Sequence, residues 1–185
     1  EEQVVADGNG VERFQVMYND YVIVGPTGGA VAYTNDIDAA LTQIKDEGLT
    51  FVSRGDDSGT HKAELKLWKA LDVDVTTLGD AYVSAGAGMG DTLVMADEMD
   101  AYCLTDRGTW LAKKANFPEM EVVVEGSAGL LNQYGVIAVN PEVYPDTNID
   151  GANAYIEWIC SEEVQALIAD FGVAEYGEPL FFPNA

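Results

Sequence analysis

Strand-like and helix-like segments alternate along this chain, and the alternation limits the folds it can adopt. Residues 13–24 are rich in β-branched and aromatic side chains and end at Gly25-Pro26, which is typical of a long strand. Apolar side chains three to four positions apart predict a helix from Ile37, capped by Asp36 or Asn35 and stopped by Gly48. The same criteria predict strands at 49–52, 101–104, 121–125 and 133–139, helices at 60–71, 90–99 and 151–171, and a short helix near Trp110. This pattern predicts an α/β class with a mixed or parallel sheet.

Two of the strand-like segments, 13–24 and 133–139, bracket the middle of the chain. Such a bracket favours a lobe inserted between two connecting strands. In the C-terminal helix the predicted core face consists of Ile156, Ile159, Val164, Leu167 and Ile168.

The charge of the chain excludes several kinds of partner. The 185 residues contain 32 Asp and Glu against 9 Lys and Arg, a formal charge of −23. Such a field repels nucleic-acid backbones and anionic membranes. Because 48% of the residues are hydrophobic, the chain is not a disordered acidic tail. Taken alone, the charge also argues against an anionic ligand.

The sequence offers little for catalysis or for metal binding. It has a single histidine, His61, and no Gly-x-Ser-x-Gly elbow to seat a nucleophile. The two cysteines, Cys103 and Cys160, form no Cys-x-x-Cys or Cys/His cluster, so a structural zinc site is not expected. Whether these cysteines form a disulfide is left open. We therefore expect a protein without enzymatic activity and without a cofactor.

The segment Ser53–Thr60 is the strongest candidate for a binding site. A predicted strand ends there, and a loop with glycines and hydroxyl side chains opens a predicted helix. The first N–H groups of a helix have no internal acceptors and carry partial positive charge, so they favour anions. Arg54 adds a fork of donors suited to an oxyanion. The alternative is an ordinary turn, in which Asp56, Asp57 and Ser58 cap the helix and Arg54 pairs with the aspartates.

Two other segments are weaker candidates. Gly86-x-Gly88-x-Gly90 precedes a predicted helix but lacks the Gly-Lys-Ser/Thr ending of a P-loop. A flexible turn beside a closely packed helix explains it as well. Asp106-Arg107 follows a predicted strand, and we expect a buried ion pair between these two residues that fixes a helix start.

Long stretches of the chain resemble one family of binding proteins. Residues 17–26 (MYNDYVIVGP), 53–70 (SRGDDSGTHKAELKLWKA), 86–110 (GAGMGDTLVMADEMDAYCLTDRGTW) and 132–141 (NQYGVIAVNP) are similar to the tungstate-binding proteins of bacterial and archaeal ABC importers (TupA type). The resemblance implies a type II periplasmic-binding-protein-like fold, in which two lobes are joined by crossing strands and enclose an oxyanion.

The resemblance also implies boundaries and ligands. Residues 1–26 would be the end of the first lobe and the first crossover strand, 27–132 the second α/β lobe, and 133–185 the return crossover with the C-terminal helix of the first lobe. Arg54 would be the charged ligand and Thr60 a hydroxyl donor, with Ser53, Ser58 and the Gly59 backbone beside them. The ligand would be tungstate or molybdate. An ABC permease would be the partner, and the location would be extracytoplasmic, with a lipid anchor on the precursor a further option.

Members of this family begin with a further segment, so the first lobe is expected to be incomplete here. A missing N-terminal segment or a second chain would then complete it. Two alternatives stay open: a phosphate or sulfate receptor, with Asp56 or Asp57 accepting a phosphate proton, and a truncated lobe used in assembly.

Overall fold

The computed structural model describes all 185 residues. The chain forms two compact units. Unit 1 comprises Glu1–Asn19 and Asn132–Ala185, and unit 2 comprises Asp20–Leu131. The helices are α1 (Glu2–Ala6), α2 (Ile37–Asp46), α3 (Gly59–Ala70), α4 (Met89–Glu98), α5 (Arg107–Lys113), α6 (Ile149–Ile159), α7 (Glu162–Asp170) and α8 (Val173–Tyr176). The strands are β1 (Gly10–Pro26), β2 (Phe51–Ser53), β3 (Tyr82–Ser84), β4 (Cys103–Asp106), β5 (Met120–Val124), β6 (Leu131–Val139) and β7 (Phe182–Pro183). None of these helices combines the length and the hydropathy that a membrane-spanning helix requires.

Unit 2 is built on a mixed sheet, which confirms the predicted α/β class. β1 pairs antiparallel with β4 and with β5, whereas β2 and β3 pair in parallel. Backbone hydrogen bonds from Val52 N to Tyr102 O and from Tyr102 N to Thr50 O join β2 to the residues before β4. β2, β3 and β4 therefore point in the same direction.

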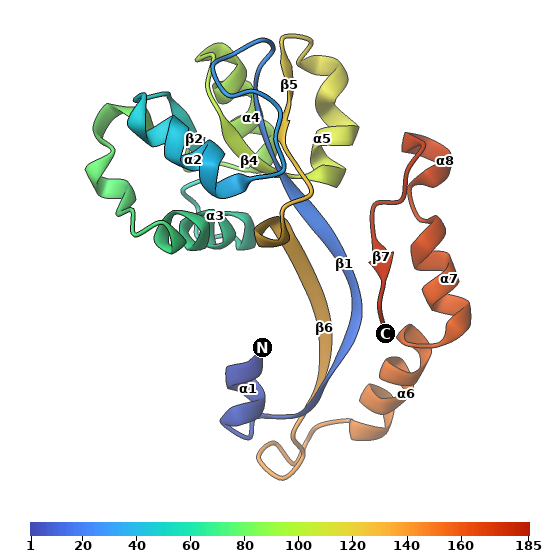
Figure 1. Cartoon of the computed structure of the whole chain (residues 1–185). Helices are drawn as coiled ribbons and strands as arrows, with labels where there is room; N and C mark the ends of the chain where they lie inside the picture. Colours follow the sequence, from blue (N-terminus) through green and yellow to red (C-terminus); the bar gives the residue numbers. More distant parts are fainter. The chain divides into compact units, whose positions relative to one another are not determined.

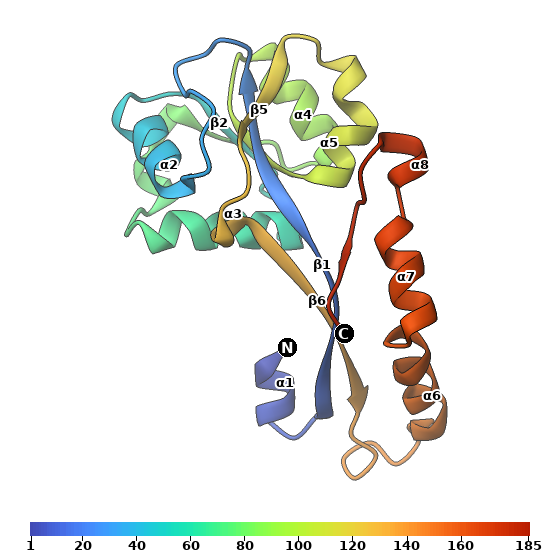
Figure 2. The ribbon, with the colours of Figure 1, turned by 45° about the vertical axis from the view of Figure 1, so that its right-hand side comes forward.

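Helices α2 and α3 lie on one side of β1, and α4 and α5 lie on the other (Figures 1 and 2). A hydrophobic cluster fills each side. Successive side chains of a strand point to opposite faces. Accordingly Ile23 joins the cluster that contains residues of α2 and α3, while Val22 and Val24 join the cluster that contains residues of α4 and α5. All three side chains are fully buried. The helices thus cover both faces, and the strand ends are left to the loops.

The loops after β2, β3 and β4 leave the sheet at one edge, because these strands run in the same direction. Each loop leads into a helix: β2 into α3, β3 into α4 and β4 into α5. Ligands of open α/β sheets bind beyond the carboxyl ends of the strands. This edge carries all three segments that the sequence nominated as candidates.

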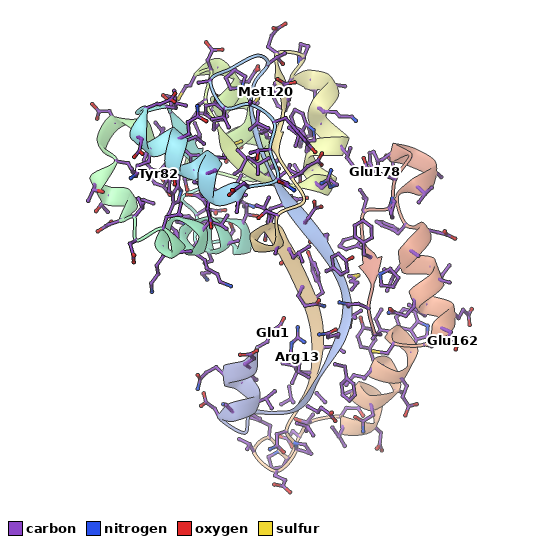
Figure 3. The ribbon with its side chains drawn as sticks, viewed as in Figure 1. Glu1, Arg13, Tyr82, Met120, Glu162 and Glu178 are labelled. Atoms are coloured by element: carbon purple, nitrogen blue, oxygen red, sulfur yellow. The ribbon has the colours of Figure 1, made fainter.

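Unit 1 contains the first part of β1, paired with β6 and, at Met17 and Tyr18, with β7. The rings of Tyr18 and Phe182 stack with centroids 5.1 Å apart. Near the start of β1, Arg13 Nε donates a hydrogen bond to Glu1 Oε2 at 2.5 Å (Figure 3). Few side chains of this unit are buried, and large apolar residues such as Trp158 and Leu167 are exposed.

One prediction about secondary structure is wrong, and one strand was not predicted. The helix expected at 151–171 is two helices, α6 and α7, separated at Cys160 and Ser161. The Ser161 hydroxyl accepts a hydrogen bond from Val164 N and caps α7, so the chain restarts there. Leu167, predicted for the core face, is 62% exposed. Strand β3 lies within a Gly-rich stretch whose composition concealed it.

The two cysteines are free. Cys103 is buried in unit 2 and Cys160 is half-buried in unit 1.

Candidate functional site

The predicted anion loop connects β2 to α3. Its first residue, Ser53, is fully buried, and its hydroxyl accepts a hydrogen bond from Gly55 N at 3.2 Å. Gly55 has a φ of 61°, a left-handed conformation that glycine adopts without strain. A Cβ on Gly55 would lie 1.8 Å from Ser84 Oγ. The hydrogen bond to Ser53 therefore fixes the loop at Gly55, and the loop packs against Ser84 at the end of β3.

The Gly-rich loop after β3 runs beside this loop. Ala85 N donates to Ser53 O at 2.8 Å, and Ala87 N donates to Arg54 O at 3.2 Å. The structure thus brings together two segments that the sequence treated as separate candidates. It also adds Ser84, an exposed hydroxyl at the end of β3. The parallel pairing of Ser53 with Ser84 would have nominated this residue had β3 been predicted.

Arg54 is the cation of the loop. One of its donors is paired with an aspartate, and another has no partner. Its Nη2 lies 2.5 Å from Asp56 Oδ2, with 19% of the Arg54 side chain exposed. Its Nε is buried and has no hydrogen-bond partner. Both predictions for Arg54 are therefore represented: it pairs with an aspartate, as in an ordinary turn, and it keeps an unused donor.

Asp56 is held in the ionised form. Hydrogen bonds from Ser58, assisted by the Arg54 guanidinium, lower the pKa of Asp56 to about 2. Ser58 N donates to Asp56 Oδ1 at 3.2 Å. The carboxylate thus occupies donors that would otherwise be free for an external anion.

The amino end of α3 supplies the remaining donors. Ser58 caps the helix by accepting from His61 N at 3.2 Å, and the first turn contains no acidic residue. The N–H groups of Gly59 and Thr60 have no acceptor within the helix because of their position. A side chain at Gly59 would meet no protein atom within 4 Å, while Thr60 is 8% exposed. The candidate donors are therefore Arg54 Nε, two backbone N–H groups and the Thr60 hydroxyl.

His61 serves this loop rather than a nucleophile. Its Nδ1 accepts a hydrogen bond from Asp57 N at 3.1 Å. It is half-buried. The three or more acidic, cysteine or histidine side chains needed to hold a metal ion do not gather anywhere in the chain.

The expected ion pair between Asp106 and Arg107 is not formed. Asp106 caps α5 by accepting from Thr109 N at 2.8 Å. Arg107 instead donates to both carboxylate oxygens of Asp20, at 2.8 and 2.5 Å, and contacts Glu125 at 2.8 Å. A helix cap needs an acceptor at the first turn, which occupies Asp106 and turns Arg107 toward β1 and β5.

A buried carboxylate lies one helical turn below the loop, and sequence reasoning missed it. Glu64 is 3% exposed and accepts a hydrogen bond from Tyr82 Oη at 2.5 Å. Burial raises the pKa of Glu64 above its ordinary range. Among so many acidic residues, nothing local marks this one. Only its spacing of four from Thr60 on an amphipathic helix could have signalled it.

Comparisons with known proteins agree with this architecture. A family profile described as a PBP superfamily domain matches residues 1–163. The chain belongs to this superfamily of periplasmic binding proteins. It is 52% identical over 189 residues to the tungstate-binding protein TupA of Peptoclostridium acidaminophilum, with all of this chain and 65% of that protein covered.

Two further relatives are similar over the whole chain. A putative ABC transporter anion-binding protein of Haloferax volcanii is 46% identical, with 55% of its length covered. The solved structure of the tungstate-binding protein TupA from Desulfovibrio alaskensis G20 superposes with a TM-score of 0.89 at 39% identity, with 74% of that chain covered. The resemblance to the TupA-type family and the type II binding-protein fold are thereby confirmed. The chain spans 55% and 65% of the two curated relatives.

Proposed function

We propose that this chain binds a tetrahedral oxyanion, tungstate or molybdate, at the loop Ser53–Thr60. The observation that carries the proposal is the buried Nε of Arg54, which has no partner and lies in the loop that opens α3. A buried donor without an acceptor costs free energy, and an oxyanion would satisfy it. The names of the relatives from Peptoclostridium acidaminophilum and Desulfovibrio alaskensis support tungstate as the ligand.

Each predicted site residue has a role in this proposal. Arg54 supplies the charged donor, Thr60 a hydroxyl, and Gly59 a backbone N–H with open space before it. Ser58 supports them by capping α3, and Ser53 by holding Gly55 N. The names of the relatives describe binding, so we assign no catalytic role.

The negative charge of the chain is compatible with this ligand. A surface field is screened within about 8–10 Å at moderate salt, whereas the proposed donors touch the anion directly. The formal charge of −23 should therefore slow association at low salt without preventing binding.

The proposed biological role is delivery of the anion to an ABC importer. The name of the Haloferax volcanii relative, an ABC transporter anion-binding protein, supports a membrane permease as partner and an extracytoplasmic location. We also propose that the exposed apolar side chains of unit 1, among them Trp158 and Leu167, pack against a further segment. That segment would be equivalent to the part of the longer relatives that this chain does not match. Adding that segment should shield both residues from solvent, and unchanged tryptophan fluorescence would contradict this.

Isothermal titration of the full-length protein with tungstate, molybdate, sulfate and phosphate tests the proposed ligand. We expect heat and micromolar or tighter binding for tungstate or molybdate. No heat from either of these anions would refute the proposal.

Phosphate is the second candidate, because a protonated phosphate needs an acceptor and Asp56 is an ionised carboxylate in the loop. Both of its oxygens already accept, from Arg54 and from Ser58, which favours an unprotonated oxyanion instead. Tighter binding of phosphate than of tungstate in the same titration would reverse this order.

A further inference from the structure

Glu64 is the only acidic or basic side chain among the buried residues of the chain. It lies on α3 four residues after Thr60, and both face the interior. Residues four apart on a helix are neighbours, so the Glu64 carboxylate lies directly below the amino end of the helix. The proposed binding function does not account for it.

Glu64 connects to the anion loop through hydroxyl groups. Tyr82, labelled in Figure 3, donates to Glu64 Oε1 at 2.5 Å. The Ser53 hydroxyl is a polar neighbour of both groups, and hydrogen bonding to it lowers the pKa of Glu64 and of Tyr82. Ser53 Oγ in turn accepts from Gly55 N. A continuous path therefore runs from the carboxylate to the backbone of the loop that carries Arg54.

The number of protons in this cluster decides its state. Ser53 and Tyr82 each have one hydroxyl proton, and an ionised Glu64 can only accept. With Glu64 ionised, the cluster holds two protons and a buried negative charge. A third proton on Glu64 removes that charge, and it can be donated to a lone pair of Ser53 or Tyr82, so no polar group loses its partner.

A bound oxyanion would favour the protonated form. Like charges close together in a weakly screened interior disfavour ionisation, and burial already raises the pKa of Glu64. The other titratable groups near this carboxylate are His61 on α3 and Tyr82 on β3, which act on Glu64, and Cys103 on β4, on which Glu64 acts. Of these, His61 lowers the pKa of Glu64 and so opposes its protonation. The negative charge of a bound oxyanion would raise that pKa and favour protonation.

We propose that Glu64 is a positioning residue for the oxyanion loop and that anion binding there is coupled to uptake of one proton by Glu64. The proton comes from solvent and breaks no other bond. This inference rests on the proposed binding function. It predicts that affinity falls as pH rises above the Glu64 pKa, by up to tenfold per pH unit for one linked proton.

The test is titration of the full-length protein with tungstate in buffers of low and high ionisation enthalpy, at neutral and alkaline pH where tungstate stays unprotonated. We expect a buffer-dependent heat equivalent to uptake of up to one proton. Glu64→Gln retains an acceptor and a donor but cannot titrate, so its binding should show no proton uptake and little dependence on pH. Glu98→Gln, at the exposed end of α4, changes the net charge equally and should behave as the wild type.

The outcomes separate this inference from the function on which it rests. Tungstate binding without proton uptake overturns the role of Glu64 and leaves the binding function standing. Uptake that persists in Glu64→Gln also overturns it, because another group must then take the proton. No binding of tungstate or molybdate overturns both.

Discussion

Arg54 Nη2 lies 2.5 Å from Asp56 Oδ2, while the Nε of the same guanidinium is buried without a partner. The carboxylate of Asp56 also accepts from Ser58 N. Within the loop, Asp56 thus takes the place that an external anion would take on part of the donor set. On the proposed site, an oxyanion would either use the donors that Asp56 leaves free or displace its carboxylate.

Replacing Asp56 by Asn tests this competition. Loss of the negative charge should strengthen tungstate binding, because repulsion is removed and Arg54 is no longer neutralised. Titration calorimetry at low ionic strength measures the effect. If phosphate were the ligand, Asp56→Asn should weaken binding instead, since a proton acceptor is lost.

Arg54→Ala should weaken tungstate binding by roughly 2–5 kcal/mol, the usual effect of removing one partner of a buried charged pair. Lys62→Ala removes a charge from the exposed side of α3 and serves as the control, with little expected change. Equal affinities for Arg54→Ala and the wild type would remove Arg54 from the site.

Thr60→Val keeps the shape of the side chain and removes its hydroxyl. We expect a loss of about 1 kcal/mol in tungstate binding, the net contribution of one hydrogen bond. Thr92→Val is the matched control in α4, where the Thr92 hydroxyl donates to Gly88 O at 3.0 Å. If Thr92→Val lowers affinity more than Thr60→Val, the Gly86–Gly90 loop holds the ligand.

Ser58→Ala removes the cap of α3 and should lower the free energy of unfolding by roughly 0.5–2 kcal/mol. Urea denaturation measures this. Ser161→Ala removes the corresponding cap of α7 in unit 1 and should cost a similar amount. A cost for Ser161→Ala alone would show that α3 is fixed by its packing and not by its cap.

Glu64→Gln should change the pH dependence of stability in a defined direction. Because burial raises the pKa of Glu64 above 4.5, the folded chain binds more protons than the unfolded chain between these two pKa values. Stability from this group is therefore present at acidic pH and is lost as pH rises through that window. Thermal denaturation should give Glu64→Gln a higher Tm than the wild type above neutrality, and a smaller difference below the ordinary pKa. A Tm difference independent of pH would contradict a titrating Glu64.

Much of unit 2 could be predicted because local signals and burial agree there. The Asp36 side chain accepts from Ala39 N at 3.0 Å, and Gly48 has a φ of 65°, as the predicted start and stop of α2 require. β1 was recognised because its β-branched residues fill both hydrophobic clusters. β3 was missed because its three residues depend on pairing with β2, which is a tertiary effect.

The site could be predicted only in part, for a similar reason. Arg54, Ser58 and Thr60 are adjacent in sequence, so their chemistry is visible in the loop. The contact of Gly55 with Ser84 and the burial of Glu64 depend on residues brought together by the sheet. Arg107 was wrongly paired because its partners, Asp20 and Glu125, are distant in the sequence.

Anomalous diffraction at the tungsten edge from crystals of the full-length protein with tungstate tests the central claim most directly. We predict a single strong peak beside Arg54 Nε, within hydrogen-bond distance of the Gly59 and Thr60 N–H groups through its oxygens. A peak elsewhere, or no peak in crystals of a protein that binds tungstate in solution, would contradict the assignment of the Ser53–Thr60 loop as the oxyanion site.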